Sequence, residues 1–435
     1  MASSGSSTEN KAREFAVTFG DGKFVDAAEL LTEDGHEHVV KSYPDEFQED
    51  SLAAKDALEQ YWWGLYGQYG DFKGIGDVAA GDSGVAVELR FAKGSETATV
   101  DVAESGVADL SFTPEYEIPD YVNHDAFTEH DVTVNAGDVN LDGALAIPDG
   151  DGPFPGVVLI HGHGIHDPDG TAGATKILKD LAWGLASNGV ASLRYEKRLN
   201  EHEVADEDYT LDTVVTDDAV AAVSTLADAG EVDAERIVVV GHSQGGMCAP
   251  RIADRHGDIA GVVLLDPPTD PIVDPDDLVF MRYSMELDGD LSEEQTEELE
   301  AMRETFRRIA DADFGPEDMV MDQPGAWHRS LHSCDPPATA SDLDAPVFVM
   351  KTGRTDETMQ GELYESLHEE FERWQAADLP DGSRTEFYES VAHYFQDGPA
   401  PATPSRLYFG ENVADYIVED ITEWIHGGAD GADSA

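Results

Sequence analysis

The chain has 435 residues, of which 91 are acidic and 26 are basic, so its formal net charge is −65. A surface this negative repels phosphate groups, which excludes nucleic acids and anionic membranes as expected partners. Intrinsic disorder is also excluded, because 41% of the residues are hydrophobic and long apolar runs can build a core. The length predicts more than one domain.

The acidic residues are spread along the whole chain, and only 10 of the 26 basic residues are lysines. This composition favours adaptation to molar salt, of the haloarchaeal kind, because salt screens the repulsion among carboxylates. The alternative is an ordinary acidic protein. The N-terminus lacks an apolar signal segment, and no run of 18 apolar residues occurs, so a cytoplasmic location is expected. Cys248 and Cys334 lack the spacing of a disulfide framework or metal site.

The first quarter of the chain predicts a small α+β domain. Residues 1–10 are rich in serine and are expected to form a disordered tail. Helical patterns follow, and from 71 to 112 the apolar residues alternate with a period of two, as in antiparallel strands. The predicted domain therefore spans 11–112. Residues 113–126 contain two prolines and no periodicity, which indicates a linker.

Strands and helices alternate from residue 127 to 428, and residues 429–435 are expected to form a second tail. Several apolar runs are continuous, as in strands that are covered on both faces. The alternation predicts an α/β fold with a doubly wound, mostly parallel sheet. The expected strands are 130–134, 141–147, 156–160, 189–195, 236–240, 261–265, 346–350 and 385–388, and the expected helices are 173–187, 212–229, 244–256, 361–377 and 411–426.

One interval, about 267–345, interrupts this alternation. Ser292 and Gln295 have the spacing of a capping box, and four apolar residues follow at helical spacing, Leu299, Met302, Phe306 and Ile309. A helical insertion at the carboxyl edge of a parallel sheet is expected to act as a lid over the site.

Gly241-His242-Ser243-Gln244-Gly245 follows an apolar strand and opens a helical run. A nucleophile elbow requires this strand–turn–helix setting, and its glycines avoid clashes across a strained turn. The motif predicts Ser243 as a catalytic nucleophile. The alternative is a tight glycine turn with an idle serine.

A nucleophilic serine requires a base and an orienting carboxylate, which follow it in the order acid, then histidine. Asp356 lies in the loop after strand 346–350, and His393 lies in the loop after strand 385–388. We therefore expect Asp356 as the acid and His393 as the base. Asp266, at the end of strand 261–265, is the competing acid.

The oxyanion hole is expected to use two backbone amides. One belongs to Gln244, directly after the nucleophile, and the other to His163 in the loop after strand 156–160, with Gly164 as the second choice. Gly164 and His242 are also expected to contact the substrate.

The same loop offers a rival interpretation. His161, His163, His166 and Asp167 resemble the zinc motif of metallo-β-lactamase-type hydrolases, although Ile165 stands where that motif has an aspartate. Because the serine assembly explains more residues, His163 and His166 are instead expected to line the mouth of the pocket or to lie at its surface. No metal or cofactor is predicted.

Several segments together resemble the α/β-hydrolases, and among them two-domain carboxylesterases of the EstD type. These are YEIPDYV, FTEHDVTV, GPFPGVVLIHGHG, DLAWGLASNGVASLRYEKR and ERIVVVGHSQGGMCAPRIA, and the resemblance extends over about 10–427. It implies a cystatin-like or nuclear-transport-factor-like leading domain and a triad of Ser243, Asp356 and His393. His163 departs from the small residue that is usual after His-Gly, which leaves the acyl preference open.

These observations predict a serine hydrolase that cleaves small-molecule carboxylic esters through an acyl-enzyme. A serine peptidase or amidase of the same fold is the first alternative, because the triad does not distinguish esters from amides. A zinc-dependent hydrolase and a non-catalytic binding protein are the others. The sequence leaves a homodimer open.

Overall fold

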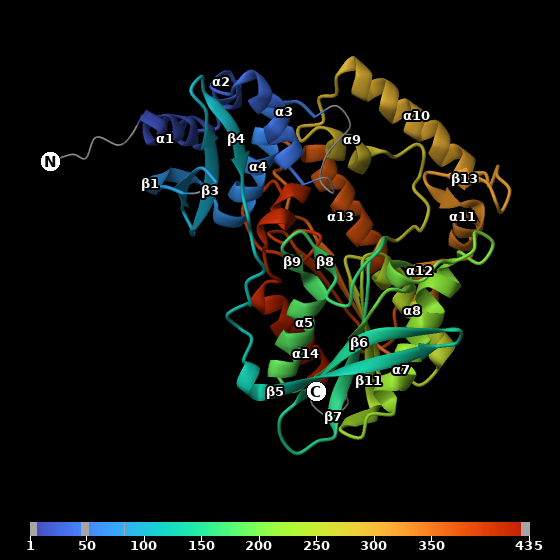
Figure 1. Ribbon diagram of the computed structural model, residues 1–435. Helices are drawn as coiled ribbons and strands as arrows, with labels where there is room; N and C mark the ends of the chain where they lie inside the picture. Colours follow the sequence, from blue (N-terminus) through green and yellow to red (C-terminus); the bar gives the residue numbers. More distant parts are fainter. Residues whose placement is uncertain (1–6, 45–51, 82, 428–435) are drawn as a thin grey trace. The chain divides into compact units, whose positions relative to one another are not determined.

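The computed structural model describes residues 7–44, 52–81 and 83–427 (Figure 1). The chain divides into two compact units, each assembled from separate segments. The small unit comprises Met1–Glu117, Ala172–Thr175 and Gly398–Glu411, and the large unit comprises the remaining segments, Ile118–Thr171, Lys176–Asp397 and Asn412–Ala435.

An eight-stranded sheet forms the centre of the large unit, in the order β16-β15-β12-β11-β7-β10-β6-β5. The first six strands in this order are mutually parallel, whereas β5 and β6 pair antiparallel at one edge. The predicted α/β fold with a mostly parallel sheet is therefore confirmed. The strands are β5 (Phe127–Ala136), β6 (Val139–Pro148), β7 (Phe154–Ile160), β10 (Ala191–Tyr195), β11 (Val232–His242), β12 (Gly261–Leu265), β15 (Val347–Thr352) and β16 (Arg384–Tyr388).

Helices cover both faces of this sheet. In β7, Val158 and Ile160 belong to the apolar core on one face, whereas Val157 and Leu159 belong to the core on the other. Alternate residues of a strand point to opposite faces, which explains why the run had to be apolar throughout. The helices of this unit outside the insertion are α5 (Ile177–Ser187), α6 (Arg198–Glu201), α7 (Asp217–Ala227), α8 (Gln244–His256), α13 (Gly361–Gln375) and α14 (Asp415–Gly427), with the short turns η2 (His124–Ala126) and η3 (Asp212–Thr216).

The insertion between β12 and β15 carries its own small core. The long helix α10 (Glu293–Ala310) buries Phe306 and Ile309, with Leu299 and Met302 packed beside them, and the predicted capping box of Ser292 and Gln295 is present. The apolar spacing therefore identified the buried face of this helix. The other elements are α9 (Val279–Met285), β13 (Met319–Val320), β14 (Gln323–Pro324), α11 (Gly325–Leu331) and α12 (Pro336–Ser341).

The small unit packs helices against a four-stranded antiparallel sheet in the order β1-β2-β3-β4. Its core is rich in aromatic rings; Tyr61 is fully buried and lies 5.0 Å from Phe112 and 6.3 Å from Phe409, measured between ring centroids. The elements are α1 (Ser7–Gly20), α2 (Phe24–Glu29), α3 (Glu33–Ser42), α4 (Ala54–Tyr69), β1 (Phe72–Ala80), β2 (Val85–Phe91), β3 (Ser95–Val102) and β4 (Val107–Ser111), with β8 (Thr171–Ala172), β9 (Thr175–Lys176) and η4 (Pro404–Phe409) from later in the chain.

The domain boundaries differ from the expected ones in two respects. The first helix begins at Ser7, so residues 7–10 of the expected tail are helical; residues 1–6 and 429–435 lie outside the described part of the chain. The chain leaves the small unit after Glu117, within the expected linker, but returns to it at Ala172–Thr175 and at Gly398–Glu411. A contribution to the core from so late in the chain leaves no local pattern in the sequence.

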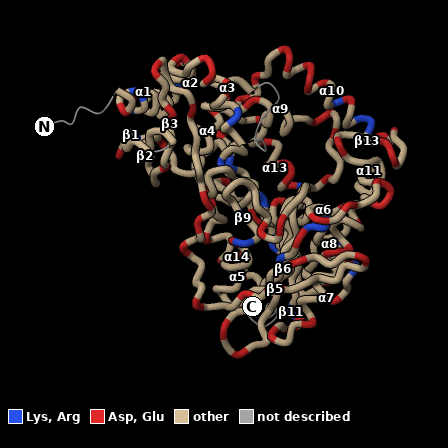
Figure 2. The backbone as a smooth tube through the Cα atoms, in the orientation of Figure 1, with Lys and Arg blue, Asp and Glu red and all other residues tan. Residues whose placement is uncertain are grey.

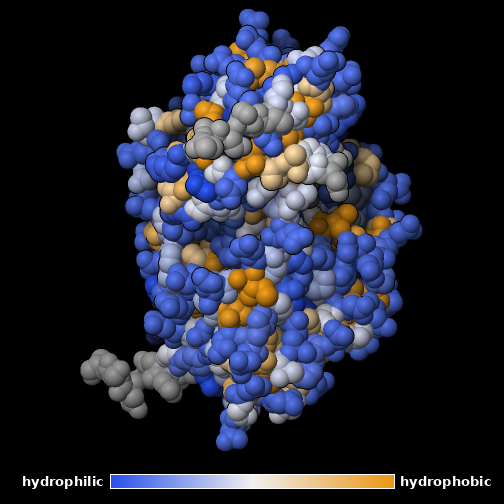
Figure 3. Space-filling model, turned by 60° about the vertical axis from the view of Figure 1, so that its left-hand side comes forward, coloured by the Kyte–Doolittle hydropathy of each residue, from blue (hydrophilic) through white to orange (hydrophobic). Residues whose placement is uncertain are grey.

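Acidic residues are spread over the described chain in both units, and basic ones are few (Figure 2). On the face shown in Figure 3, hydrophilic residues predominate and hydrophobic ones form small separate patches. In the part of the chain that the structure describes, every helix is too short or too polar to cross a membrane.

Candidate active site

Ser243 stands at the sharp turn between β11 and α8. Its backbone has φ 53° and ψ −116°, a conformation that residues with a side chain rarely adopt. The Ser243 amide donates a 2.7 Å hydrogen bond to the carbonyl of Leu265, at the end of the neighbouring strand β12. The serine is therefore held in a strained turn at the carboxyl edge of the sheet.

The two glycines that flank this turn are required by close packing. A Cβ atom on Gly241 would come within 2.2 Å of the Gly245 carbonyl oxygen, and one on Gly245 within 2.5 Å of the Ile160 carbonyl oxygen. These are backbone atoms, which cannot move aside without disrupting the turn. The glycine spacing that pointed to Ser243 thus has a steric cause in this chain.

His393 lies in the loop after β16, and its side chain is 45% exposed. Its Nδ1 atom donates a 2.5 Å hydrogen bond to Oδ2 of Asp266, the residue that follows β12. In a neutral imidazole with a proton on Nδ1, Nε2 is free to accept a proton. His393 therefore has an orienting carboxylate on one ring nitrogen and a basic second nitrogen.

The expected partnership of Asp356 with His393 is wrong in this structure. The Asp356 carboxylate accepts hydrogen bonds of 2.9 and 3.1 Å from the amides of Thr358 and Met359, in the turn before α13. A short aspartate side chain readily caps neighbouring amides in this way. The competing acid, Asp266, occupies the position beside His393.

Asp266 is 8% exposed and its carboxylate is saturated with donors. Thr352 donates to it through its hydroxyl at 2.8 Å and its amide at 3.3 Å, and the Lys351 ammonium lies 2.8 Å from Oδ1. Burial opposes the charge, but Lys351 and the hydrogen bond to His393 together hold the pKa of Asp266 well below its usual range. The carboxylate is therefore ionised.

His242 was expected to contact the substrate, but it is only 4% exposed. Its Nε2 atom donates a 2.9 Å hydrogen bond to the backbone carbonyl of His393. Burial, reinforced by the nearby His393, lowers the pKa of His242 to about 3, so its ring is neutral. The structure corrects the expected role: His242 supports the loop that carries His393.

The loop His161–Gly164 lies beside Ser243. A Cβ atom on Gly162 would be 3.4 Å from the Ser243 Cβ atom, and the Gly162 carbonyl accepts a 2.5 Å hydrogen bond from the buried ammonium of Lys197. Because the C=O and N–H of a trans peptide point in opposite directions, the amide of His163 faces away from Lys197. Gln244 begins α8 directly after Ser243. The oxyanion roles of the His163 and Gln244 amides remain predictions, as does substrate contact by Gly164.

Two ring nitrogens of the rival zinc cluster are engaged elsewhere. His161 is 3% exposed and its Nε2 atom donates to the Asp167 carbonyl at 3.1 Å, while His166 Nε2 donates to the His163 carbonyl at 2.8 Å. A nitrogen that donates a proton has no lone pair for a metal. Within residues 7–44, 52–81 and 83–427, no group of three or more His, Cys, Asp and Glu side chains is arranged to hold a metal ion.

The insertion contributes an aromatic side chain next to this loop. The Trp327 ring of α11 lies 6.0 Å from the His163 ring and 5.6 Å from that of Tyr209, between centroids, and Trp327 is 4% exposed. The bulky Trp327 ring therefore limits the space beside His163.

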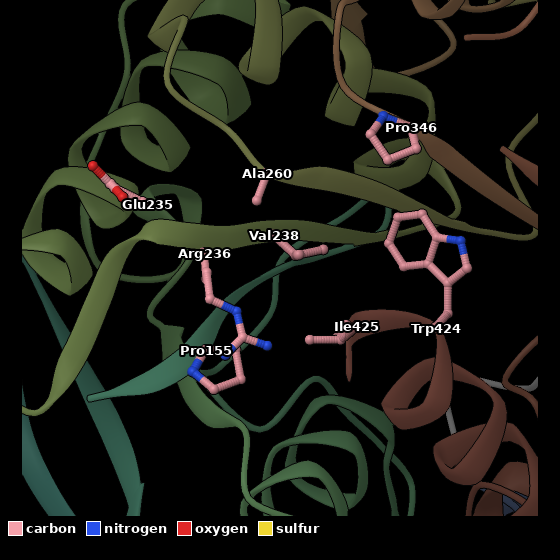
Figure 4. A pocket seen from close by; sticks show the side chains of 8 residues that line it. All are labelled: Pro155, Glu235, Arg236, Val238, Ala260, Pro346, Trp424 and Ile425. Atoms are coloured by element: carbon pink, nitrogen blue, oxygen red, sulfur yellow. The ribbon is translucent and has the colours of Figure 1, made fainter. Parts of the chain in front are cut away.

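A separate pocket of about 210 Å³ lies at the opposite, amino-terminal edge of the parallel strands (Figure 4). Pro155 and Val238 line it from β7 and β11, and Trp424 and Ile425 of α14 face them. This pocket is not the candidate site, because Ser243, Asp266 and His393 all follow the carboxyl ends of their strands.

Comparison with known proteins identifies the fold family. Residues 157–402 match the Alpha/beta hydrolase family. Esterase EstD of Thermotoga maritima is 31% identical over 384 residues, which cover 85% of this chain and 87% of the relative. Among solved structures, Est1E from Butyrivibrio proteoclasticus (TM-score 0.42, 15% identity, 69% of this chain and 98% of the other) and an esterase from Pyrobaculum calidifontis (0.43, 16%, 71% and 87%) are similar. The chain belongs to the alpha/beta hydrolase family.

Proposed function

We propose that this protein hydrolyses small-molecule carboxylic esters through an acyl-enzyme, with Ser243 as nucleophile, His393 as general base and Asp266 as the orienting acid. The observation that carries the proposal is the 2.5 Å hydrogen bond from His393 to a buried, ionised Asp266 at the same sheet edge as the strained Ser243. The 31% identity to Esterase EstD of Thermotoga maritima supports ester hydrolysis as the activity.

In the first half of the reaction, the Ser243 hydroxyl oxygen attacks the ester carbonyl carbon while His393 Nε2 takes the hydroxyl proton. Asp266 stabilises the imidazolium that forms, and the amides of His163 and Gln244 stabilise the charge on the carbonyl oxygen. The tetrahedral intermediate then collapses; the bond to the alcohol oxygen breaks, and the imidazolium gives its proton to the leaving alcohol.

In the second half, a water molecule attacks the acyl-enzyme, and His393 Nε2 takes a proton from that water. Collapse of the second intermediate breaks the bond to Ser243 Oγ, which takes the proton back from the imidazolium. The products are the carboxylic acid and the free enzyme. The 45% exposure of the His393 side chain is compatible with access for substrate and water.

The acyl side of the site is proposed to be small. Trp327, packed between His163 and Tyr209, limits the space beside the expected oxyanion loop, which favours short acyl chains. A p-nitrophenyl ester series of increasing acyl length tests this point, because kcat/KM is expected to fall beyond short chains.

The small unit is proposed to take no part in the chemistry, since Ser243, Asp266 and His393 all belong to the large unit. Its resemblance to a cystatin-like or nuclear-transport-factor-like domain is likewise a proposal, supported by helices packed on a four-stranded antiparallel sheet.

The acidic composition is proposed to be an adaptation to molar salt, in a cytoplasmic protein. With a net charge of −65, self-repulsion rises as the screening length grows from about 3 Å at 1 M to about 10 Å at 0.1 M salt. Thermal unfolding in a KCl series is the test, and equal stability at 0.1 M and 3 M would contradict this proposal.

The decisive experiment for the activity combines covalent labelling with kinetics. A fluorescent serine-directed phosphonate is expected to label the wild type, and not Ser243→Ala, while a chelator leaves turnover unchanged. Aminoacyl amides assayed beside the esters separate an esterase from a peptidase. Full ester hydrolysis by Ser243→Ala would overturn the proposal.

A further inference from the structure

A lysine is buried directly behind the proposed catalytic acid. Lys351 belongs to β15, whose other residues are apolar except for the last, Thr352. The lysine is only 2% exposed, although its side chain carries a charge. Its ammonium contacts three oxygens: Oδ1 of Asp266 at 2.8 Å, Oε2 of Glu370 at 2.9 Å and the Pro267 carbonyl at 3.1 Å. An ammonium has three protons, so this geometry satisfies all of them.

These contacts keep the lysine charged in spite of its surroundings. Burial lowers the pKa of Lys351, but the adjacent carboxylates of Asp266 and Glu370 raise it further, and the net direction is upward. Isolated buried charges are strongly unfavourable, and paired ones are retained when their geometry is complete. Lys351 is therefore a fixed positive charge.

The lysine also determines how the Asp266 carboxylate is turned. Oδ1 faces Lys351 and the Thr352 amide, whereas Oδ2 faces His393 and the Thr352 hydroxyl. Glu370 is held in turn, because its second oxygen accepts a 3.0 Å hydrogen bond from the Thr269 amide. The result is a row of three alternating charges, Glu370, Lys351 and Asp266, that ends at the His393 ring.

We propose that Lys351 and Glu370 are positioning residues that act through Asp266, Lys351 by holding the carboxylate charged and aimed at His393, and Glu370 by balancing the charge of the lysine. This inference rests on the proposed function, in which His393 is the base. It gives β15, through Lys351, and α13, through Glu370, the role of holding the Asp266 carboxylate in place.

Other polar groups surround the Asp266–His393 pair and must be considered in any pH effect. His242 at the end of β11 contacts the His393 carbonyl and is neutral, and the Asp356 carboxylate is occupied by its own turn. The groups that face the pair or its loop are Lys351 and Arg354 from β15 and its loop, Glu370 from α13, His242 from β11 and Tyr394 from the histidine loop. Among these, the Lys351 ammonium contacts the Asp266 carboxylate directly, and Glu370 acts on it through Lys351.

The proposal predicts pH shifts of opposite sign for two variants. In Lys351→Met a positive charge beside the pair is lost, so the pair holds its proton more tightly and the acid limb of kcat/KM moves up, by about one pH unit. In Glu370→Gln a negative charge is lost, so the positive charge of Lys351 acts more strongly on the pair, which holds its proton less tightly. The acid limb of kcat/KM therefore moves to lower pH, by about half a unit. A purely structural role would lower activity at every pH without moving the limb.

The experiment measures kcat/KM for a short-chain p-nitrophenyl ester from pH 4.5 to 9 in the full-length protein. Glu369→Gln is the matched control, because it removes the same charge from the neighbouring, exposed position of α13 and should leave the profile unchanged. If Lys351→Met does not fold, Glu370→Gln still decides the question through the direction of its shift.

Two failures are distinguishable. If Ser243→Ala loses turnover but the acid limb stays in place in both charge variants, or moves in the same direction in both, the positioning proposal is overturned and the esterase proposal stands. If Ser243→Ala keeps full turnover, the proposed function itself fails, whatever the profiles show.

Discussion

The first 117 residues and the large unit bury very different side chains. In residues 7–44, 52–81 and 83–117, the buried positions are apolar side chains, tyrosine and glycine, and every charged side chain is at least partly exposed. The large unit instead buries a series of charged groups in its interior, among them Asp180, Arg194, Lys197, Asp218, Asp266 and Lys351. Both units follow the same rules of packing, but these first 117 residues carry no buried ion where the structure describes them; in the small unit, the buried ion pair of Arg406 and Glu411 belongs to the late segment Gly398–Glu411.

This difference distinguishes a part of the chain that provides only stability from a part that carries the candidate active site. Burying an ion is costly unless partners surround it, so a fold that needs only stability has no reason to do so. Some buried pairs are structural, such as Arg198 with Asp218. Lys197 and Lys351 are different, because their ammonium groups touch the loops beside Ser243 and His393. The two kinds of buried ion differ in their distance from the proposed catalytic residues.

The sharpest test of the buried site is its acid. Asp266→Asn is expected to lower kcat by about 10⁴, because the amide no longer stabilises the imidazolium or its tautomer. Asp356→Asn is the matched control and should cost less than tenfold, since this carboxylate caps a turn. Steady-state kinetics on a soluble ester measure both, and reversed magnitudes would return the acid to the loop after β15.

A core truncation in each unit tests the separation of scaffold from site. Leu89→Ala in β2 of the small unit is expected to cost about 2–5 kcal/mol of unfolding free energy, with kcat unchanged where the protein remains folded. Leu264→Ala in β12 should cost a similar amount and also lower kcat, because the next residue holds the Ser243 amide. Chemical denaturation and kinetics below the transition measure both effects. Equal loss of kcat in the two variants would contradict the separation.

Lys197 allows a test by pH. Burial lowers its pKa to about 8, so between pH 8 and the usual value of 10.5 the unfolded chain binds a proton that the folded chain has released. Stability conferred by this group therefore rises with pH in that window. Relative to Lys197→Met, the wild type should gain about 2 kcal/mol between pH 7 and pH 9.5. Parallel urea titrations of the two proteins check this, and a constant difference would mean that Lys197 titrates normally.

The smallest expected effects are at helix caps, where the two units should behave alike. Ser292 caps α10 in the insertion, and Thr32 caps α3 in the small unit through a 2.9 Å hydrogen bond from the Gly35 amide. Replacing either by alanine should cost about 1 kcal/mol of unfolding free energy. Denaturation curves measure this cost, and a loss several times larger at one cap would show that it does more than end a helix.

Most of the large unit could be predicted from local patterns. The continuous apolar run at 156–160 predicted a strand covered on both faces, and the glycines around Ser243 predicted the turn. The choice between Asp266 and Asp356 could not be made locally, because both follow strands at the same edge. It depends on Lys351, which is brought against Asp266 only when β12 and β15 pair. A charged residue within the apolar run at 347–352 was the signal, since such a lysine needs a buried carboxylate.

The return of Gly398–Glu411 to the small unit has a consequence for how the protein is made. Phe409 completes a core whose other members are synthesised almost entirely before residue 113. At about 5–20 residues per second, the ribosome needs roughly 15–60 s to reach Phe409 after finishing Glu117. During that interval the nascent N-terminal segment lacks part of its own interior. The region translated first therefore becomes complete only shortly before the large unit, whose last core residues lie on α14.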